Sequence, residues 1–414
     1  MARSIEPPTG GVPPGARLPG VEVFLHPAYR RLWASGCFVY FARWVDLVAL
    51  GWLALELTGS PFMVGLAAFA RTAPMMVVGP FAGVIADQVA PGRVLVLTQA
   101  GGVVVALALA LLFGSGAGRY WPFVGLEVIV GALWALDFSA RRTSIYAILG
   151  PARVTHAVSL ETVSMQVAKL GGPLLAGFTL ARLGPAATFT LLAALYAGGL
   201  AVSSGLRRSI PRPAGVDALS VVESLRAGLQ AAWAHPMIKG VLLATVAMNV
   251  LVFPYQHMLS VFARDVLAGG PGVLGALIAA EGLGALVGAL AIAALRRHPP
   301  QERLFGISIM VIPAMVVAFS LSPSLSVCLL LLVVLGLVES AFGATQTTVV
   351  LLSAPERNRG GAVGILSACI GTQPIGALAI GMLASMAGAP LAFAINALTA
   401  LVLTVPLGAR LLRR

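Results

Sequence analysis

An arginine and an aspartate stand three residues apart in an otherwise apolar stretch of this chain. The stretch reads FARWVDLVALGW and lies inside an apolar run that covers about 34–57. At this spacing in a helix, Arg43 and Asp46 share one face and can neutralise each other. Burying charge among apolar residues is costly, so the pair marks either a functional site or a structural anchor of its helix.

A second pair of opposite charges lies near the end of another apolar segment, 121–140. Asp137 precedes Arg141 by one helical turn, so the two side chains are expected to pair. Arg141 and Arg142 come at the end of this segment, where basic residues commonly anchor a helix at the membrane surface. For the two arginines we favour this anchoring role, whereas Asp137 is expected to line the substrate cavity.

An acid and an amide lie within the apolar segment 325–350. Glu339 and Gln346 lie about two helical turns apart and would share one side of a helix. A carboxyl group removed from water keeps its proton more readily, which suits it to taking up and releasing a proton near neutral pH. Asp46 and Glu339 are therefore the expected proton carriers.

Other side chains in apolar segments suit contacts with a ligand that is polar at one end and apolar at the other. The stretch NVLVFPYQHM supplies Asn249, Tyr255 and Gln256 as hydrogen-bonding groups. Trp134 and Phe138 can form aromatic walls for such a ligand, although aromatic residues in these segments more often face lipid or pack against other helices.

The composition indicates which elements carry these residues. Only 10% of the 414 residues are charged, 58% are hydrophobic and the mean hydropathy is +0.94. A soluble domain of this length carries about a quarter charged residues. Too few charges are present to cover a surface that faces water, so the chain is predicted to be an integral membrane protein.

Several classes of function are excluded. The net charge is +12, but the basic residues do not alternate with aromatic ones along a groove, which argues against nucleic acid. The three cysteines lack metal-ligand and disulfide spacings. The sequence has no P-loop, HExxH or nucleophile–base set, so we expect no enzyme, no catalytic residue, no metal, no cofactor and no use of ATP.

Apolar stretches of about 20 residues, long enough to cross a bilayer as helices, recur along the chain. Breaks at charges, prolines and glycines predict an all-α membrane protein with twelve transmembrane helices in two pseudo-symmetric bundles of six. The expected helices lie near 34–57, 61–86, 94–114, 121–140, 157–181, 186–206, 239–262, 272–295, 303–321, 325–350, 360–386 and 389–409.

The basic residues predict how these helices are oriented. Twenty-one of the 27 lysines and arginines fall in the tails and in the loops on one side, and three fall in the loops on the other side. Cytoplasmic loops are rich in lysine and arginine, so both termini are expected in the cytoplasm. The expected location is the cytoplasmic (inner) membrane of a bacterium, in which the chain is a multi-pass protein.

The expected domains are a flexible cytoplasmic tail (1–23), an N-terminal bundle (24–206), a cytoplasmic linker (207–238) and a C-terminal bundle (239–414). Within the linker, 220–233 has the apolar spacing of an amphipathic surface helix or of an ordinary solvated one. An internal repeat supports the two bundles: GSPFMVGLAAFARTA from Gly59 resembles GGPGVLGALIAAEGL from Gly269, with Arg71 opposite Glu281. Transporters built from such repeats bind substrate between the halves.

The loop between the second and third expected helices carries a further motif. It reads GVIADQVAPGRV, with Gly83, Asp87 and Arg93 at the spacing of a signature of the major facilitator superfamily. With its twelve expected helices, the chain resembles this superfamily over essentially its whole length beyond the tail. The resemblance implies that the loop latches the two halves in one conformation, although Gln88 replaces an arginine that is usual there.

More particular motifs resemble a bacterial exporter branch that includes the enterobactin and macrolide exporters. They are ELTGSPFMVGL, SARRTSIYAIL, QVAKLGGPLLAG and SAPERNRGGAVG. The third resembles an antiporter motif that is only partly kept. The resemblance assigns conformational roles to Arg141, Lys169, Gly172, Pro173, Gly177, Arg357 and Arg359.

The resemblance implies a secondary active transporter, a proton-coupled exporter of small amphipathic compounds such as drugs or siderophore-like metabolites, working by alternating access. Uptake by symport and lipid flipping remain alternatives with the same fold, and a non-transporting membrane sensor is a third. The expected partners are a small-molecule substrate, protons and membrane lipid, and the expected oligomeric state is a monomer.

Overall fold

The computed structural model describes residues 21–88, 90–150, 153–206, 210, 229–230, 233, 235–294, 300–354 and 359–412. Within these ranges the protein is all-helical and contains no β-strand. After the short 3-10 helix η1 (Val21–Leu25), the long helices of the first part are α1 (Pro27–Thr58), α2 (Pro61–Gln88), α3 (Pro91–Gly114), α4 (Tyr120–Leu149) and α5 (Val154–Ser203). Those of the second part are α7 (Pro236–Ala247), α8 (Leu259–Asp265), α9 (Pro271–Ala294), α10 (Gln301–Ser320), α11 (Leu325–Ser353), α12 (Arg359–Ile370), α13 (Gln373–Ala387) and α14 (Ala389–Leu412).

Most of these helices suit a bilayer. Ten helical stretches of the described chain are long and apolar enough to cross a membrane. They also present large apolar side chains outward, such as Leu111 and Val402, each 72% exposed. Exposing such a surface to water costs free energy, whereas exposing it to lipid does not. Helices satisfy their own backbone polar groups, which lipid cannot do.

Helix α5 is too long for one crossing. Its 50 residues would extend about 75 Å, more than twice the hydrocarbon core. The backbone turns at Gly184, where φ is 82°, a conformation that glycine adopts without strain. Across this turn the Thr188 hydroxyl donates a hydrogen bond of 3.1 Å to the Thr179 hydroxyl. The turn lies between the expected segments 157–181 and 186–206.

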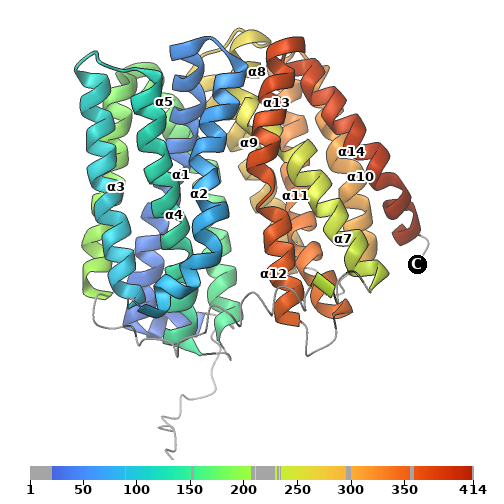
Figure 1. The fold of residues 1–414 in the computed structure, drawn as a ribbon, viewed down its shortest axis with the longest axis horizontal. Coiled ribbons are helices and arrows are strands. Elements are labelled where there is room, and N and C mark those ends of the chain that lie inside the picture. Colours follow the sequence, from blue (N-terminus) through green and yellow to red (C-terminus); the bar gives the residue numbers. More distant parts are fainter. Residues whose placement is uncertain are drawn as a thin grey trace, which may run out of the picture.

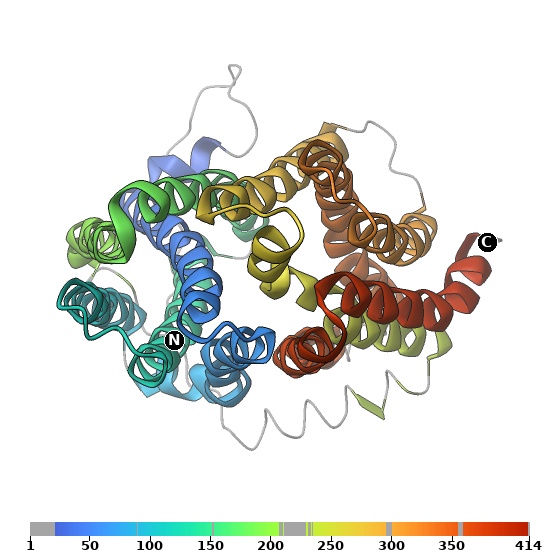
Figure 2. The ribbon, with the colours of Figure 1, turned by 90° about the horizontal axis from the view of Figure 1, so that it is seen from above.

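The helices form two groups side by side, α1–α5 and α7–α14 (Figure 1; Figure 2 shows them from above). The groups meet where α5 packs on α9 and where α2 packs on α13, and α1 also contacts α8. Toward the end of the molecule where α12 begins, α2 and α12 diverge in Figure 1.

Glycines allow the two groups to approach closely. A Cβ atom at Gly65 of α2 would lie 2.5 Å from the carbonyl oxygen of Ala377 on α13. A Cβ atom at Gly177 of α5 would lie 2.8 Å from the carbonyl oxygen of Pro271 on α9. Only glycine permits such backbone contacts, as in other membrane helix interfaces. Gly65 therefore has the same role as Gly275, its repeat equivalent, which faces Pro173.

The first crossing of the second group is irregular. Between α7 and α8 the chain forms a π-helical turn (Met248–Val252) and a 3-10 turn (Phe253–Met258). Pro254 lacks an N–H group and its ring displaces the preceding carbonyl, so a regular helix cannot continue through it. This irregular backbone aims Gln256 and His257 toward the other helix group.

Some sequence predictions differ from the structure or lie outside its described part. α1 begins at Pro27, earlier than expected, and the segment expected at 360–386 is two helices interrupted at Gly371 and Thr372. Outside the described residues lie most of the tail 1–23, most of the linker, and Arg357. Of the helix expected at 220–233, only Leu229, Gln230 and Trp233 are described, and they are helical. The side chains of Asp87 and Arg359 and the surroundings of Gly83 also lie outside the described part. Arg93 is described and is exposed.

Candidate functional site between the helix groups

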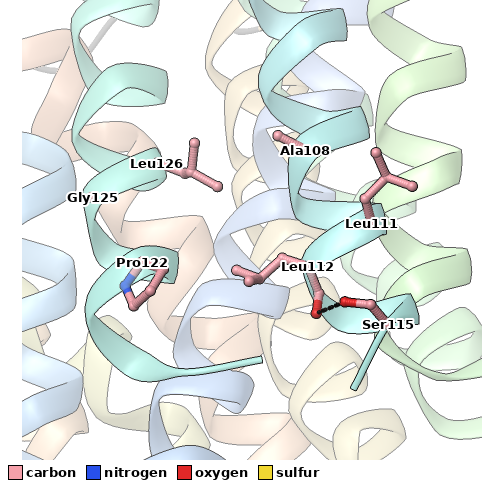
Figure 3. A pocket seen from close by; sticks show the side chains of 7 residues that line it. All are labelled: Ala108, Leu111, Leu112, Ser115, Pro122, Gly125 and Leu126. Carbon is pink, nitrogen blue, oxygen red and sulfur yellow. Dashed lines mark hydrogen bonds between the residues drawn. The ribbon is translucent and has the colours of Figure 1, made fainter. Parts of the chain in front are cut away.

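The structure has a large apolar pocket on its outer surface, shown in Figure 3. It has a volume of about 590 Å³ between α3 and α4 and is lined by Ala108, Leu111, Leu112, Ser115, Pro122, Gly125 and Leu126. Its one polar side chain, Ser115, donates a hydrogen bond to the Leu112 carbonyl at 3.2 Å. No charged group lines this pocket, which suits a lipid chain and offers nothing for selective polar binding.

A smaller cavity of about 130 Å³ lies between the two helix groups. Residues of α1, α2 and α5 line one side and residues of α8, α9, α13 and the 3-10 turn line the other. They are Arg43, Trp44, Leu47, Leu50, Gly51, Val64, Ala68, Thr72, Lys169, Gln256, His257, Ser260, Leu274, Ile278, Glu281 and Gln373. Apolar walls with a few convergent polar and charged groups are typical of a small-molecule site.

Lys169 joins the two groups at the edge of this cavity. Its Nζ lies 2.9 Å from Glu281 Oε1 on α9 and 3.2 Å from Glu339 Oε2 on α11. The Gln256 amide also donates hydrogen bonds to both carboxylates. Lys169 is 6% exposed, Glu281 is fully buried and the Glu339 side chain is 24% exposed, so the cation and one of its two acids are buried. We call these four residues the Lys169 cluster.

A second buried charge cluster lies wholly within the first helix group. Arg71 of α2 forms ion pairs with Asp46 of α1 and with Glu127 of α4, the latter at 2.9 Å. Asp46 and Glu127 are fully buried and Arg71 is 3% exposed. One arginine therefore faces two carboxylates, which we call the Arg71 cluster.

Asp46 does not form the pair that its spacing from Arg43 suggested. Its carboxylate turns to Arg71, and Asp46 does not line the cavity between the groups. Arg43 does line that cavity, and its Cζ lies 4.1 Å from the centre of the Trp134 ring. The aromatic face holds the guanidinium by a cation–π interaction in place of the expected carboxylate.

The expected pairing of Asp137 with Arg141 is present, at 3.0 Å. Arg141 is only 1% exposed and also donates a 2.8 Å hydrogen bond to the Leu32 carbonyl. It lies 4.0 Å from Glu161 of α5, whose carboxylate accepts a hydrogen bond from Tyr40. Arg141 thus ties α1, α4 and α5 together inside the group, and the preferred interpretation as a surface anchor does not hold for it.

The other expected cavity residues lie at several places. Gln256 lines the cavity, and Glu339 reaches its edge through Lys169. The remaining ones do not line it, because their side chains are engaged elsewhere. Tyr255 packs against Phe319 and Phe393, and Asp137 pairs with Arg141. The Asn249 amide donates a hydrogen bond to the Thr245 carbonyl, and the Gln346 side-chain oxygen accepts one from the Thr245 hydroxyl. Trp134 lies under Arg43, and Phe138 contacts Trp134 and Arg142.

The sequence alone does not predict that Lys169 and Glu281 belong to the site, because Lys169 fits a conformational motif and Glu281 a repeat position. Both are nevertheless charged residues within apolar segments, which is as strong a signal as that of Asp46. Of the motif residues around Lys169, Gly172 packs on Trp44 of α1, and Pro173 and Gly177 pack on α9.

The chain as a whole matches a family model described as transmembrane secretion effector, over residues 21–412. The chain belongs to this family of the major facilitator type. Members and relatives are transporters, so the chain is a multi-pass membrane transporter and not an enzyme.

Two relatives of the chain have named activities. The chain is 26% identical over 372 residues to the multidrug efflux pump Tap of Mycolicibacterium fortuitum, and the alignment covers 87% of this chain and 90% of the pump. It is 21% identical over 383 residues to the staphyloferrin A transporter of Staphylococcus aureus, covering 90% of this chain and 93% of that transporter.

Solved structures share the fold. A peptide-bound POT family transporter has a TM-score of 0.70 at 13% identity, covering 91% of this chain and 95% of the other. A bacterial homologue of the human lysosomal transporter Spinster, inward-facing and unoccupied, has a TM-score of 0.67 at 16% identity, covering 96% of both chains. These likenesses establish the major facilitator fold.

Proposed function

We propose that this transporter is a proton-coupled exporter of small amphipathic compounds, drugs or siderophore-like metabolites, that works by alternating access. The observation that carries the proposal is the Lys169 cluster. Lys169 belongs to the first helix group, and the two carboxylates that hold it belong to the second, beside the cavity.

The cluster supplies a way to couple protons to movement. An ion pair buried between two helix groups resists their separation, because each charge would be left without a partner. Protonation of Glu281 or Glu339 removes one negative charge and weakens the hold on Lys169. Uptake of a proton therefore favours rearrangement of the groups around the cavity, and release of the proton restores the pair.

The architecture that we propose has twelve spans, six in each group, and extends over 24–206 and 239–414 with the linker 207–238 between them. Ten helical stretches of the described chain are long and apolar enough to cross a membrane. The division of α5 at Gly184 makes two spans of one stretch, and α2 is the twelfth span. Both termini lie in the cytoplasm of a bacterial cell, as the placement of basic residues supports.

The described conformation is closed at the end where α1 terminates. Gly51 of α1 approaches Ser260 of α8, and Arg264 donates a hydrogen bond of 3.4 Å to the Leu55 carbonyl. With the termini in the cytoplasm, this closed end is the outer one. We therefore propose that the described conformation faces inward.

The Arg71 cluster supports a second proton position. Asp46 and Glu127 share a single arginine in a region without water-exposed surface. Two buried carboxylates beside one cation are costly unless one of them holds a proton. Asp46 thus remains a proton-coupling candidate, through Arg71 and away from the substrate.

The named relatives support export of amphipathic compounds, since one is a multidrug efflux pump and the other a siderophore transporter. A growth experiment tests the proposal. A susceptible bacterium that expresses the protein should tolerate higher concentrations of some toxic amphipathic compounds, and the same host with Glu339→Gln at equal expression should not. Unchanged tolerance across the panel, or greater sensitivity through uptake, would contradict export.

A further inference from the structure

We infer that the cavity between the helix groups selects amphipathic compounds that carry a carboxylate, and that Arg43 binds this carboxylate. The inference rests on the proposed function and adds the chemical class of the substrate. It depends on which charges of the cavity are already neutralised and which are not.

Four ionisable side chains line the cavity in the described part of the chain: Arg43, Lys169, His257 and Glu281. Lys169 and Glu281 neutralise each other at 2.9 Å, and Glu339 adds a second carboxylate at 3.2 Å from Lys169. Both carboxylates at the cavity, Glu281 and Glu339, are therefore already paired with Lys169.

Arg43 has no such partner. Among the described residues, no carboxylate oxygen lies within 4.0 Å of its guanidinium nitrogens, which is the distance limit for an ion pair. Asp46, on the same helix, is committed to Arg71. A cation that lines a narrow cavity with no carboxylate in ion-pair contact attracts an anion more strongly than a cation in bulk water does.

The contact with Trp134 prepares Arg43 for binding. The guanidinium lies over the ring, with Cζ 4.1 Å from the ring centre. This cation–π contact adds no negative charge to the arginine, and the N–H edge of an arginine can bind a carboxylate through two parallel hydrogen bonds. Trp134 thus positions Arg43 without neutralising it.

The remaining walls fit the rest of such a molecule. Leu47, Leu50, Leu274 and Ile278 provide apolar surface from both helix groups. His257 Nε2 and Ser260 Oγ belong to lining residues, and both atoms are buried without a hydrogen-bond partner among the described residues. Buried polar atoms are nearly always bonded, so these two are suited to the polar groups of a bound molecule.

A compound whose only charge is positive fits this cavity less well. To reach a carboxylate it must displace Lys169 from Glu281 or Glu339, which leaves a buried ammonium without a partner. An anion meets Arg43 with no such exchange. The arrangement therefore favours compounds with a negative group.

A matched pair of dyes provides the test. Rhodamine 110 has a free carboxyl group, and rhodamine 123 is its methyl ester with the same ring system. Binding of each dye to the full chain in lipid nanodiscs is measured by fluorescence polarisation. The wild type should bind rhodamine 110 about tenfold more tightly, the effect of a hydrogen-bonded charge pair. Arg43→Gln should remove this preference.

Two further variants make the result interpretable. Arg43→Lys keeps the charge and should keep part of the preference, and it also serves if Arg43→Gln does not fold. Arg119→Gln removes the same charge at an exposed position at the start of α4 and should change nothing. Equal or tighter binding of the ester, binding of neither dye, or a preference that survives Arg43→Gln would overturn the inference.

Transport of the dyes separates this inference from the proposed function. If the free acid binds through Arg43 but no proton gradient moves either dye, the inference stands and proton-coupled export fails. If a gradient drives both dyes equally and Arg43→Gln has no effect, export stands and carboxylate selection fails.

Discussion

Lys169 of α5 lies 2.9 Å from Glu281 of α9 and 3.2 Å from Glu339 of α11, so one cation joins the two helix groups inside the membrane-spanning part. Lys169→Met would leave the buried Glu281 and the partly exposed Glu339 without a cation. Loss of one partner of a buried pair costs roughly 3–5 kcal/mol. We expect a clearly lower midpoint of thermal unfolding in detergent. Lys169→Arg keeps the charge and should unfold near the wild-type temperature, and a Met variant as stable as the wild type would contradict this role.

The Arg71 cluster predicts unequal effects of neutralising its members. Glu127→Gln leaves Asp46 paired with Arg71, one charge against one, and should change stability little. Arg71→Leu leaves two buried carboxylates and should lower stability by roughly 3–5 kcal/mol, measured by the same unfolding assay. If Glu127→Gln were the more damaging of the two variants, the two acids would not share one arginine in the way described.

The glycines between the groups predict that small side chains are required there. Gly177→Ala places a methyl group 2.8 Å from the Pro271 carbonyl oxygen, so α5 and α9 must move apart. Overpacking of this kind costs about 1–3 kcal/mol. A lower unfolding temperature and reduced transport are expected. Gly125→Ala on the lipid-facing side of α4, where no atom lies within 4 Å of the added methyl group, is the matched control and should behave as wild type.

The approach of Gly51 to Ser260 predicts a cross-link at the closed end. A Cβ atom at Gly51 would lie 3.6 Å from Ser260 Cβ, within the range of a disulfide. Gly51→Cys with Ser260→Cys, in a background without Cys37, Cys328 and Cys369, should cross-link on oxidation. Alternating access requires this end to open, so oxidation should stop transport and a reductant should restore it. Full transport by the oxidised protein, with each single variant as control, would contradict a gate here.

The spans and the repeat were predictable because they are patterns of many residues. Apolar runs broken by prolines and glycines place most helix ends within a few residues, but α1 begins at Pro27 where 34 was expected, and α4 ends at Leu149 where 140 was expected. Pro61 and Pro271, matched in the repeat, each begin a helix in the structure. The repeat also pairs Arg71 with Glu281, and the carbonyl of each contacts a glycine of a neighbouring helix, Gly131 and Gly336.

Spacing along one helix predicts the Asp137–Arg141 pair but not the partners of charges that pair between helices. Arg43 and Asp46 share a helix face, but the pairing depends on which helix packs on that face, and α2 brings Arg71 to Asp46. Tyr255 has the chemistry of a substrate contact, yet the backbone irregularity around Pro254 directs it into a cluster with Phe319 and Phe393. Such contacts are set by helix rotation and tilt, which one sequence does not encode locally.

The central claim is that a proton gradient drives substrate through the cavity by way of the Lys169 cluster. The most direct measurement follows rhodamine 110 in proteoliposomes of the purified protein, with and without an imposed pH gradient, for the wild type and for Glu339→Gln. The wild type should accumulate dye only with the gradient, on the side from which protons leave. Glu339→Gln should still exchange dye but lose the response to pH. Equal wild-type transport with and without the gradient, or a Glu339→Gln protein that responds as the wild type does, would contradict the claim.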